Sequence, residues 1–264
     1  MRTATVHFEV DGWARDAARS LRDEGFCIVR AGGEQVSDRV LERCRVAASS
    51  RLSDLIARVG RRDVELWRRG AADADAEPFR YLELVHREGT GRYDMPLPWC
   101  VDGQAGDVSL PAAEEVAFGE LHDAMDGVAR PVVGALWADH GAVSEETMRC
   151  GCVISEPGAA VLPWHRDGPD GLVTVFAPLT PFTAQNGPTD LAPATHHGGV
   201  DDAAPSGVAP LLLPGDLLLF DYRCLHRGLA NQGDARREIA YVVYARDGVR
   251  DVQNFPSATT LEFD

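Results

Sequence analysis

The sequence predicts an α+β fold in which a helical N-terminal layer packs on a C-terminal β jelly roll. Apolar residues recur at helical spacing through much of residues 1–147. From Met148 onward, short β-prone runs are separated by Pro and Gly, which is typical of an antiparallel sandwich or barrel. The 264 residues contain no internal repeat or evident linker. We therefore predict a single domain over 1–264, with its jelly-roll core in 148–246.

The N-terminal part carries the helical patterns. Trp13–Glu24 places its apolar residues on one helical face, and Gly25 is suited to end that helix. The apolar run Phe26–Val29 then predicts a short strand. Further helical segments are expected from Ser37 to Ala48, in Leu52–Val59, within residues 60–77 and in Ala112–His140.

The C-terminal part carries the strand patterns, which are Cys150–Ser155, Val173–Ala177, Leu211–Leu213, Leu217–Phe220 and Ile239–Tyr244. Between the two parts, Gly89–Gly106 has the composition of a loop. Loops at the mouth of a jelly roll often hold the substrate, so Gly91–Met95 and Trp99 are candidates for a lid. Trp99 is equally suited to be a hydrophobic plug.

The charge of the chain limits the classes of partner that it can bind. The formal net charge is −15, and all 26 basic residues are arginine. So acidic a protein repels phosphate backbones, so we expect no nucleic-acid partner. The absence of lysine excludes Schiff-base and P-loop lysine chemistry. No apolar N-terminal segment or run of about 18 apolar residues occurs, so we expect a cytoplasmic protein that does not enter a membrane.

The residues that indicate chemistry begin with His165-x-Asp167. On a strand, these two side chains lie on the same face because side chains alternate with period two. His226 follows a later β-prone run and supplies a third candidate ligand. Two histidines and one carboxylate form a facial triad, which leaves adjacent positions of Fe(II) open. Those positions suit a chelating 2-oxo acid and O₂.

A 2-oxo diacid bound in this way has a far carboxylate that needs a cation. Arginine suits it because the planar guanidinium matches a carboxylate. Arg237 and Arg236 both lie where the Ile239–Tyr244 strand begins. Alternation places Arg237 on one face with Ile239 and Tyr241, and Arg236 on the other. We therefore predict that Arg237 binds the far carboxylate.

These residues resemble the phytanoyl-CoA dioxygenase-like family of Fe(II)/2-oxoglutarate oxygenases, in the form found in natural-product tailoring. The resemblance rests on His165-x-Asp167, His226 and Arg237, and also on Asn186–Thr189, Ala192–His196 and Asp221–Asn231. It implies a double-stranded β-helix core of the cupin type. It also implies Fe(II), 2-oxoglutarate and O₂ as cofactor and cosubstrates, with Thr189 assisting Arg237. Asp167 stands where halogenating relatives have a small residue, so the resemblance implies oxygenation.

The sequence departs from the family at two places. A glutamine often precedes the first metal histidine, and here Val161-Leu162-Pro163-Trp164 stands in its place. The usual Pro-Gly-Ser-His reads Pro193-Ala194-Thr195-His196. The first difference removes one usual contact to the cosubstrate. The second changes a turn without touching the chemistry.

Simpler interpretations exist for each residue. His165 and His226 can be satisfied core or turn residues, Asp167 can form an Asx turn, and Thr189 can cap the turn after Gly187. Trp164 is expected to point away from the site into the core. Among the remaining histidines, His196 is expected to be structural and His197 solvated, because adjacent residues on an extended chain point apart.

Together, the residues predict a dioxygenase that oxidises an unactivated C–H bond of a small organic substrate, by hydroxylation, desaturation or cyclisation. The sequence around His226 favours a secondary metabolite as the substrate. The alternatives are an acyl-CoA hydroxylase, a metal enzyme without 2-oxoglutarate, and a non-catalytic partner subunit. Arg237 argues against the second and the intact triad against the third. The sequence does not indicate an oligomeric state.

Overall fold

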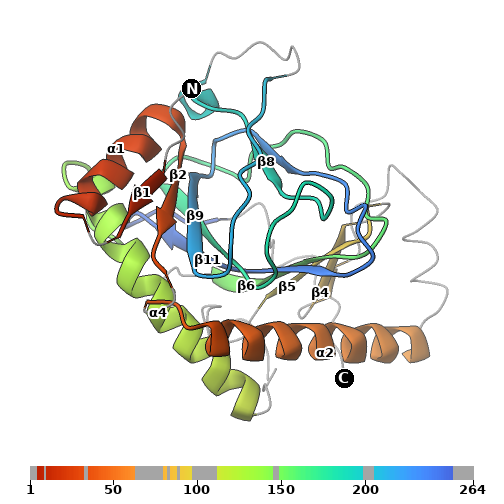
Figure 1. The fold of residues 1–264 in the computed structure, drawn as a ribbon. Helices are drawn as coiled ribbons and strands as arrows, with labels where there is room; N and C mark the ends of the chain where they lie inside the picture. Colours follow the sequence, from red (N-terminus) through yellow and green to blue (C-terminus); the bar gives the residue numbers. More distant parts are fainter. Residues whose placement is uncertain are drawn as a thin grey trace.

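A computed structural model describes residues 5–8, 10–32, 35–62, 80–81, 84–87, 90–96, 112–144, 149–198 and 205–251. The fold combines a large sheet, a small sheet and few helices (Figure 1). The helices are α1 (Trp13–Glu24), α2 (Asp38–Arg62), α4 (Ala112–Trp137) and the 3₁₀ turn η2 (Thr195–His197). Among these residues no helix is long and apolar enough to cross a membrane.

The large sheet has nine strands in the order β1-β2-β9-β7-β11-β6-β5-β4-β3. Its strands are β1 (Thr5–His7), β2 (Phe26–Arg30), β3 (Arg80–Tyr81), β4 (Leu84–Arg87), β5 (Arg92–Pro96), β6 (Arg149–Ser155), β7 (Leu172–Pro178), β9 (Asp216–Asp221) and β11 (Arg237–Ala245). The small sheet pairs β8 (Thr189–Leu191) with β10 (His226–Gly228). β1 pairs parallel to β2, and the other neighbouring strands pair antiparallel.

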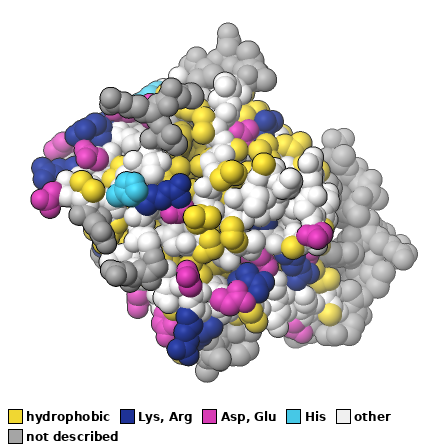
Figure 2. Space-filling model, in the orientation of Figure 1, with side chains coloured by type: hydrophobic (Ala, Val, Ile, Leu, Met, Phe, Trp, Pro, Cys, Tyr) yellow, Lys and Arg dark blue, Asp and Glu magenta, His cyan; other side chains and the backbone are white. Residues whose placement is uncertain are grey.

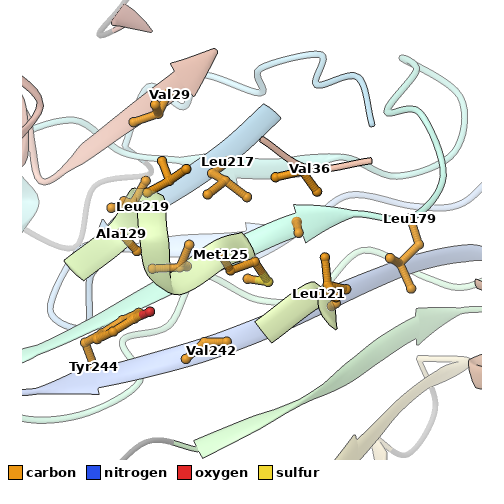
Figure 3. Packing of buried hydrophobic residues seen from close by; sticks show 14 of the residues in the cluster. Val29, Val36, Leu121, Met125, Ala129, Leu179, Leu217, Leu219, Val242 and Tyr244 are labelled. Carbon is orange, nitrogen blue, oxygen red and sulfur yellow. The ribbon is translucent and has the colours of Figure 1, made fainter. Parts of the chain in front are cut away.

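The two faces of the large sheet have different tasks. Helices α1, α2 and α4 cover one face, where apolar side chains form the main core (Figures 1 and 3). In that core Met125 of α4 packs among Leu219 of β9 and Val242 of β11. The opposite face points toward the small sheet and carries two smaller apolar clusters. Both faces are therefore buried, which explains why the central strands read as nearly continuous apolar runs.

β11 shows how one strand serves both faces. Ala240, Val242 and Tyr244 join the main core beneath the helices. Ile239 and Tyr241 alternate with them and line the cavity on the other face. This alternation follows from the period of two along a strand.

The structure confirms most predicted elements and corrects three. The two helices expected in 37–59 are one continuous helix, α2. Leu211–Leu213 forms no strand, and the side chains of Leu211 and Leu213 are 53% and 60% exposed. Arg92–Pro96, expected in a loop, is strand β5 paired with β6. Trp99 and most of the segment predicted in 60–77 lie outside the described residues.

The surface in Figure 2 is mixed, with acidic and arginine side chains interspersed around apolar patches. The arginines visible on this face form no continuous basic area. The overall charge of −15 agrees with this view.

Candidate metal centre and adjoining cavity

A cavity of about 390 Å³ is lined by residues of both sheets. The large sheet supplies side chains from β5, β6, β7 and β11, and the small sheet supplies Thr189, His226 and Gly228. The connection before β7 adds a third side through Leu162–Asp167. Apolar side chains such as Phe176 and Val243 form much of its wall. A concave, largely apolar space with a few convergent polar groups is the usual form of a small-molecule site.

His165, Asp167 and His226 converge at this cavity. His165 Nε2 lies 3.8 Å from Asp167 Oδ1, and His226 Nε2 lies 3.5 Å from Asp167 Oδ2. One ligand atom from each residue falls within 4.8 Å of the others. These separations exceed those of direct hydrogen bonds. They suit three donors that share one ion.

The histidine rings are oriented by backbone carbonyls. His165 Nδ1 donates to Pro163 O at 3.0 Å, and His226 Nδ1 donates to Cys224 O at 3.0 Å. A carbonyl only accepts, so each ring carries a proton on Nδ1, and Nε2 is the nitrogen that supplies a lone pair when the ring is neutral. Hydrogen bonds of this kind fix the tautomer of a metal-binding histidine. Both Nε2 atoms are thus ready to act as ligands.

The backbone brings the ligands together without a regular strand at His165. His165 and His226 form an isolated antiparallel bridge, and Asp167 N donates to Tyr222 O at 2.9 Å. The expectation that His165-x-Asp167 lies on one strand is therefore wrong. The local extended geometry at the bridge still directs both side chains to the same side.

These three residues fit a divalent ion of the Fe(II) type. Two neutral imidazoles and one carboxylate give the donor set of a facial triad. The side chains of His165, Asp167 and His226 are 38%, 20% and 7% exposed, so the group opens on one side. That open side faces the cavity. An ion held here would keep coordination positions available for other molecules.

Arg237 lies at the start of β11 with its side chain in the cavity wall. It is 2% exposed, and its Nη1 donates to Gly187 O at 2.6 Å. Burial and, to a smaller extent, the charge of Arg92 lower the pKa of Arg237 to about 9, against the opposing effect of Glu238. Arg236 points to the other face and pairs with Glu156 at 2.8 Å. The alternation predicted for the two arginines is confirmed.

The turn before β8 positions both Gly187 and Thr189. Gly187 has φ of +74°, and a Cβ there would lie 2.3 Å from Leu229 O. Only glycine fits that approach, which lets Gly187 O reach Arg237. Thr189 is 4% exposed and lines the cavity opposite Gly228 in the small sheet. The structure therefore brings Thr189 and Arg237 to the same cavity.

Arg92, which the sequence predicts in a lid, is instead part of the cavity wall. Arg92 on β5 is 1% exposed and lines the cavity with Arg237. Its Nη1 donates to Ser155 Oγ at 3.2 Å, and its Nη2 donates to Leu229 O. Burial lowers the pKa of Arg92 to about 10. The alternation Arg-Tyr-Asp-Met was the one signal for a strand, and the surrounding Gly and Pro residues obscured it.

Trp164, His196 and His197 are not among the residues that line the cavity. Trp164 is half-buried, with Arg227 Cζ 4.3 Å from its ring centroid, so its expected role in the core is wrong. His196 is buried and donates from Nε2 to Arg22 O at 3.0 Å, whereas His197 is exposed. Their rings stack at 3.9 Å instead of pointing apart, because η2 is helical.

Comparison with known proteins places this arrangement in a family. The family profile described as phytanoyl-CoA dioxygenase (PhyH) matches residues 21–239. The chain belongs to the phytanoyl-CoA dioxygenase family. Among curated relatives, dioxygenase FrzG of Cladobotryum sp is 33% identical over 92 residues, or 29% of this chain and 30% of FrzG. The matches span only 30% to 44% of the length of such relatives.

Solved structures show the same fold as this member of the phytanoyl-CoA dioxygenase family. The non-heme alpha ketoglutarate dependent carbocyclase SnoK from nogalamycin biosynthesis has a TM-score of 0.56 at 14% identity, covering 94% of this chain and 93% of SnoK. EvdO2 from Micromonospora carbonacea var. aurantiaca, complexed with 2-oxoglutarate, has a TM-score of 0.51 at 18% identity, covering 93% and 96%.

The structure shows where the two departures from the phytanoyl-CoA dioxygenase pattern lie. Leu162 and Pro163 line the cavity where the family often has a glutamine, so this part of the wall is apolar. Ala194 adopts φ of +60°, the left-handed conformation that the missing glycine would adopt freely. The turn therefore keeps its shape, and Ala194 carries the conformational cost.

Proposed function

We propose that this protein is an Fe(II)- and 2-oxoglutarate-dependent dioxygenase that oxidises an unactivated C–H bond of a small organic molecule. The observation that carries the proposal is the convergence of His165, Asp167 and His226 on a cavity that also contains the buried guanidinium of Arg237. A metal centre alone would serve many reactions. A buried arginine at the same cavity supports a cosubstrate with a far carboxylate.

Each residue has a defined task in this proposal. His165 Nε2, His226 Nε2 and Asp167 would hold Fe(II), which with 2-oxoglutarate supplies the activation of O₂. Arg237 pairs with the far carboxylate, and the Thr189 hydroxyl donates a hydrogen bond to it. The apolar wall formed by residues such as Ile239 and Val243 excludes water from the reacting groups.

The arrangement of the sheets supports a finer description of the core. Strand β10 carries His226 in a small sheet that faces the cavity side of the large sheet. We interpret the two as the layers of a double-stranded β-helix, or jelly roll, within one domain. The bridge between His165 and His226 joins the segment before β7 to strand β10, which agrees with this interpretation.

The proposed substrate is a small secondary metabolite, oxidised by hydroxylation, desaturation or cyclisation. A cavity of about 390 Å³ has the volume of a small-molecule site. The structurally similar SnoK comes from nogalamycin biosynthesis, which supports the same class. The alternative of an acyl-CoA hydroxylase rests on the family description alone. A non-catalytic partner role is disfavoured because all three ligand positions retain their donors.

The decisive test combines binding with turnover. Anaerobic addition of Fe(II) and 2-oxoglutarate to the wild type should give a weak visible absorption band, and exposure to O₂ should give succinate. His165→Ala should abolish both readouts. Arg237→Gln should retain metal binding and lose affinity for 2-oxoglutarate. A wild type without the band, or His165→Ala with full succinate formation, would disprove the proposal.

A further inference from the structure

The proposed function uses one buried arginine, but the cavity contains two. Arg92 is 1% exposed and Arg237 is 2% exposed. Within the described residues, no carboxylate oxygen forms a salt bridge with either guanidinium, and Nε of each has no hydrogen-bond partner. Asp94, two residues from Arg92 on the same face, instead accepts a hydrogen bond from Tyr241 at 2.9 Å. Two buried cations without an anion call for a ligand that carries one.

The sheet register places the two arginines in a single row. Arg92 on β5 and Arg237 on β11 are both the register partners of Ser155 on β6. Side chains at register partners point to the same face of a sheet. Arg92, Ser155 and Arg237, which we call the arginine row, therefore lie side by side across three strands. The charge of Arg92 also lowers the pKa of Arg237, which agrees with their proximity.

The small sheet presents a matching row across the cavity. Thr189 and Gly228 are register partners there. A Cβ on Gly228 would lie 2.9 Å from Arg92 Cζ, so the missing side chain makes room for the guanidinium. Arg92 Nη2 reaches Leu229 O, and Arg237 Nη1 reaches Gly187 O, both on segments that flank this row. Through these two hydrogen bonds, the arginine row meets the segments around Thr189 and Gly228 and closes one end of the cavity.

The distance of this closed end from the metal ligands fits a short diacid. His226 and Gly228 are two residues apart on β10, a rise of about 6.6–6.8 Å along a strand. A five-carbon 2-oxo diacid that chelates an ion held by His226 spans a comparable length. Its far carboxylate would then arrive between the guanidiniums of Arg92 and Arg237.

We infer that Arg92 is a second anchor for the far carboxylate of the cosubstrate, which is held between two guanidiniums. The inference rests on the proposed function and adds a specific requirement to it. The site should favour a dianionic 2-oxo acid over a monocarboxylic one by the attraction of two charges. Gly228 takes part indirectly, because its lack of a side chain gives Arg92 its position.

The test measures binding of two ligands to the anaerobic Fe(II) protein by calorimetry. The ligands are 2-oxoglutarate and 2-oxopentanoate, which has the same chain length without the far carboxylate. Arg92→Gln should weaken 2-oxoglutarate roughly 10- to 100-fold and leave 2-oxopentanoate within about two-fold. Arg92→Lys, which keeps the charge but loses the planar fork, should fall between wild type and Arg92→Gln.

A second variant tests the same inference without changing Arg92. Gly228→Ala should displace the guanidinium and weaken 2-oxoglutarate in the same direction. The double variant with Arg92→Gln should be no weaker than Arg92→Gln alone, because both changes act on one contact. Gly119→Ala in α4 is the matched control, since a Cβ there meets nothing within 4 Å. This control should bind 2-oxoglutarate like the wild type.

The outcomes separate this inference from the proposed function. A wild type that fails to bind 2-oxoglutarate contradicts the proposed function itself. If Arg237→Gln loses affinity and Arg92→Gln and Arg92→Lys keep it, the proposed function stands and the second anchor is wrong. An equal loss for both ligands in Arg92→Gln also overturns the inference, because the effect would then be independent of the far carboxylate. Circular dichroism of each variant establishes that the protein has folded.

Discussion

His165 and His226 are hydrogen-bonded to each other through their backbones in both directions, with each N–O distance at 3.0 Å. The same pairing brings their imidazole rings to a centroid distance of 4.4 Å. The chain therefore places two of the three candidate ligands through main-chain geometry alone. Side-chain replacement should leave this pairing intact while removing the donors.

This pairing gives the first prediction. His165→Ala should weaken Fe(II) binding at least about 100-fold with little change in the melting temperature, because His165 is part-exposed and its backbone bonds remain. Anaerobic calorimetry with Fe(II) measures the affinity. His197→Ala is the matched control because His197 is exposed outside the site, and its affinity should equal the wild type. Unchanged affinity in His165→Ala would contradict its assignment as a ligand.

The second prediction concerns the turn that supports Arg237. Gly187→Ala should lower the free energy of unfolding by roughly 2–4 kcal/mol, from left-handed strain and from the clash with Leu229 O. Gly158→Ala has a similar φ of +80° but meets nothing within 4 Å. That control should cost only about 1 kcal/mol of strain. Urea denaturation measures both, and equal costs would show that the contact with Leu229 is unimportant.

The third prediction concerns the strained turn at Ala194. Ala194→Gly should raise the free energy of unfolding by roughly 0.5–1 kcal/mol, because glycine adopts φ of +60° without strain. The gain is partly offset by the greater freedom of glycine in the unfolded chain. Thermal denaturation provides the measurement. A lower melting temperature for Ala194→Gly would mean that contacts of the Ala194 methyl group outweigh its backbone strain.

The fourth prediction concerns stability at alkaline pH. Burial raises the pKa of Tyr244 well above its ordinary value, and Asp126, which accepts its hydrogen bond at 2.9 Å, raises it further. The folded protein therefore keeps a proton that the unfolded chain loses above pH about 10, so stability falls as pH rises past that value. Tyr244→Phe should be about 1 kcal/mol less stable at pH 7.

The same variant separates this tyrosine from other alkaline effects. Phenylalanine cannot ionise, so the deficit of Tyr244→Phe should shrink between pH 10 and pH 11. Urea denaturation of both proteins across that interval provides the comparison. A constant deficit would contradict the proposed contribution of Tyr244 to the pH dependence.

The sequence predicted the parts of the fold that depend on local periodicity. Trp13–Glu24 and the strand that follows it agree with the structure because both patterns are strong and end at Gly25. Arg237 and Arg236 were separated correctly by alternation along a strand. The contact between His165 and His226 is long-range; it was predicted from the donor set of a facial triad, and the bridge between the two residues agrees with it.

What the sequence could not predict depends on long-range pairing. β5 is a strand because β6 pairs with it, and the Gly and Pro residues around it predict a loop. Local composition therefore predicts that Arg92 lies in a lid, whereas the structure places it in the cavity wall. Likewise, Leu211–Leu213 has strand composition but forms no strand; Leu212 is buried, whereas Leu211 and Leu213 stay exposed. Neither outcome can be inferred from residues close in the sequence.

The alternation along β11 limits how the protein can change its substrate. Single replacements at Val243, which faces the cavity, alter the shape of the pocket and leave the core beneath the helices untouched. An inserted or deleted residue in the middle of the same strand would either send Val242 and Tyr244 into the cavity or turn Arg237 toward the apolar core, depending on which half of the strand keeps its register. Directed evolution of this scaffold should therefore accumulate substitutions along β11 and accept changes of length only in the connections between strands.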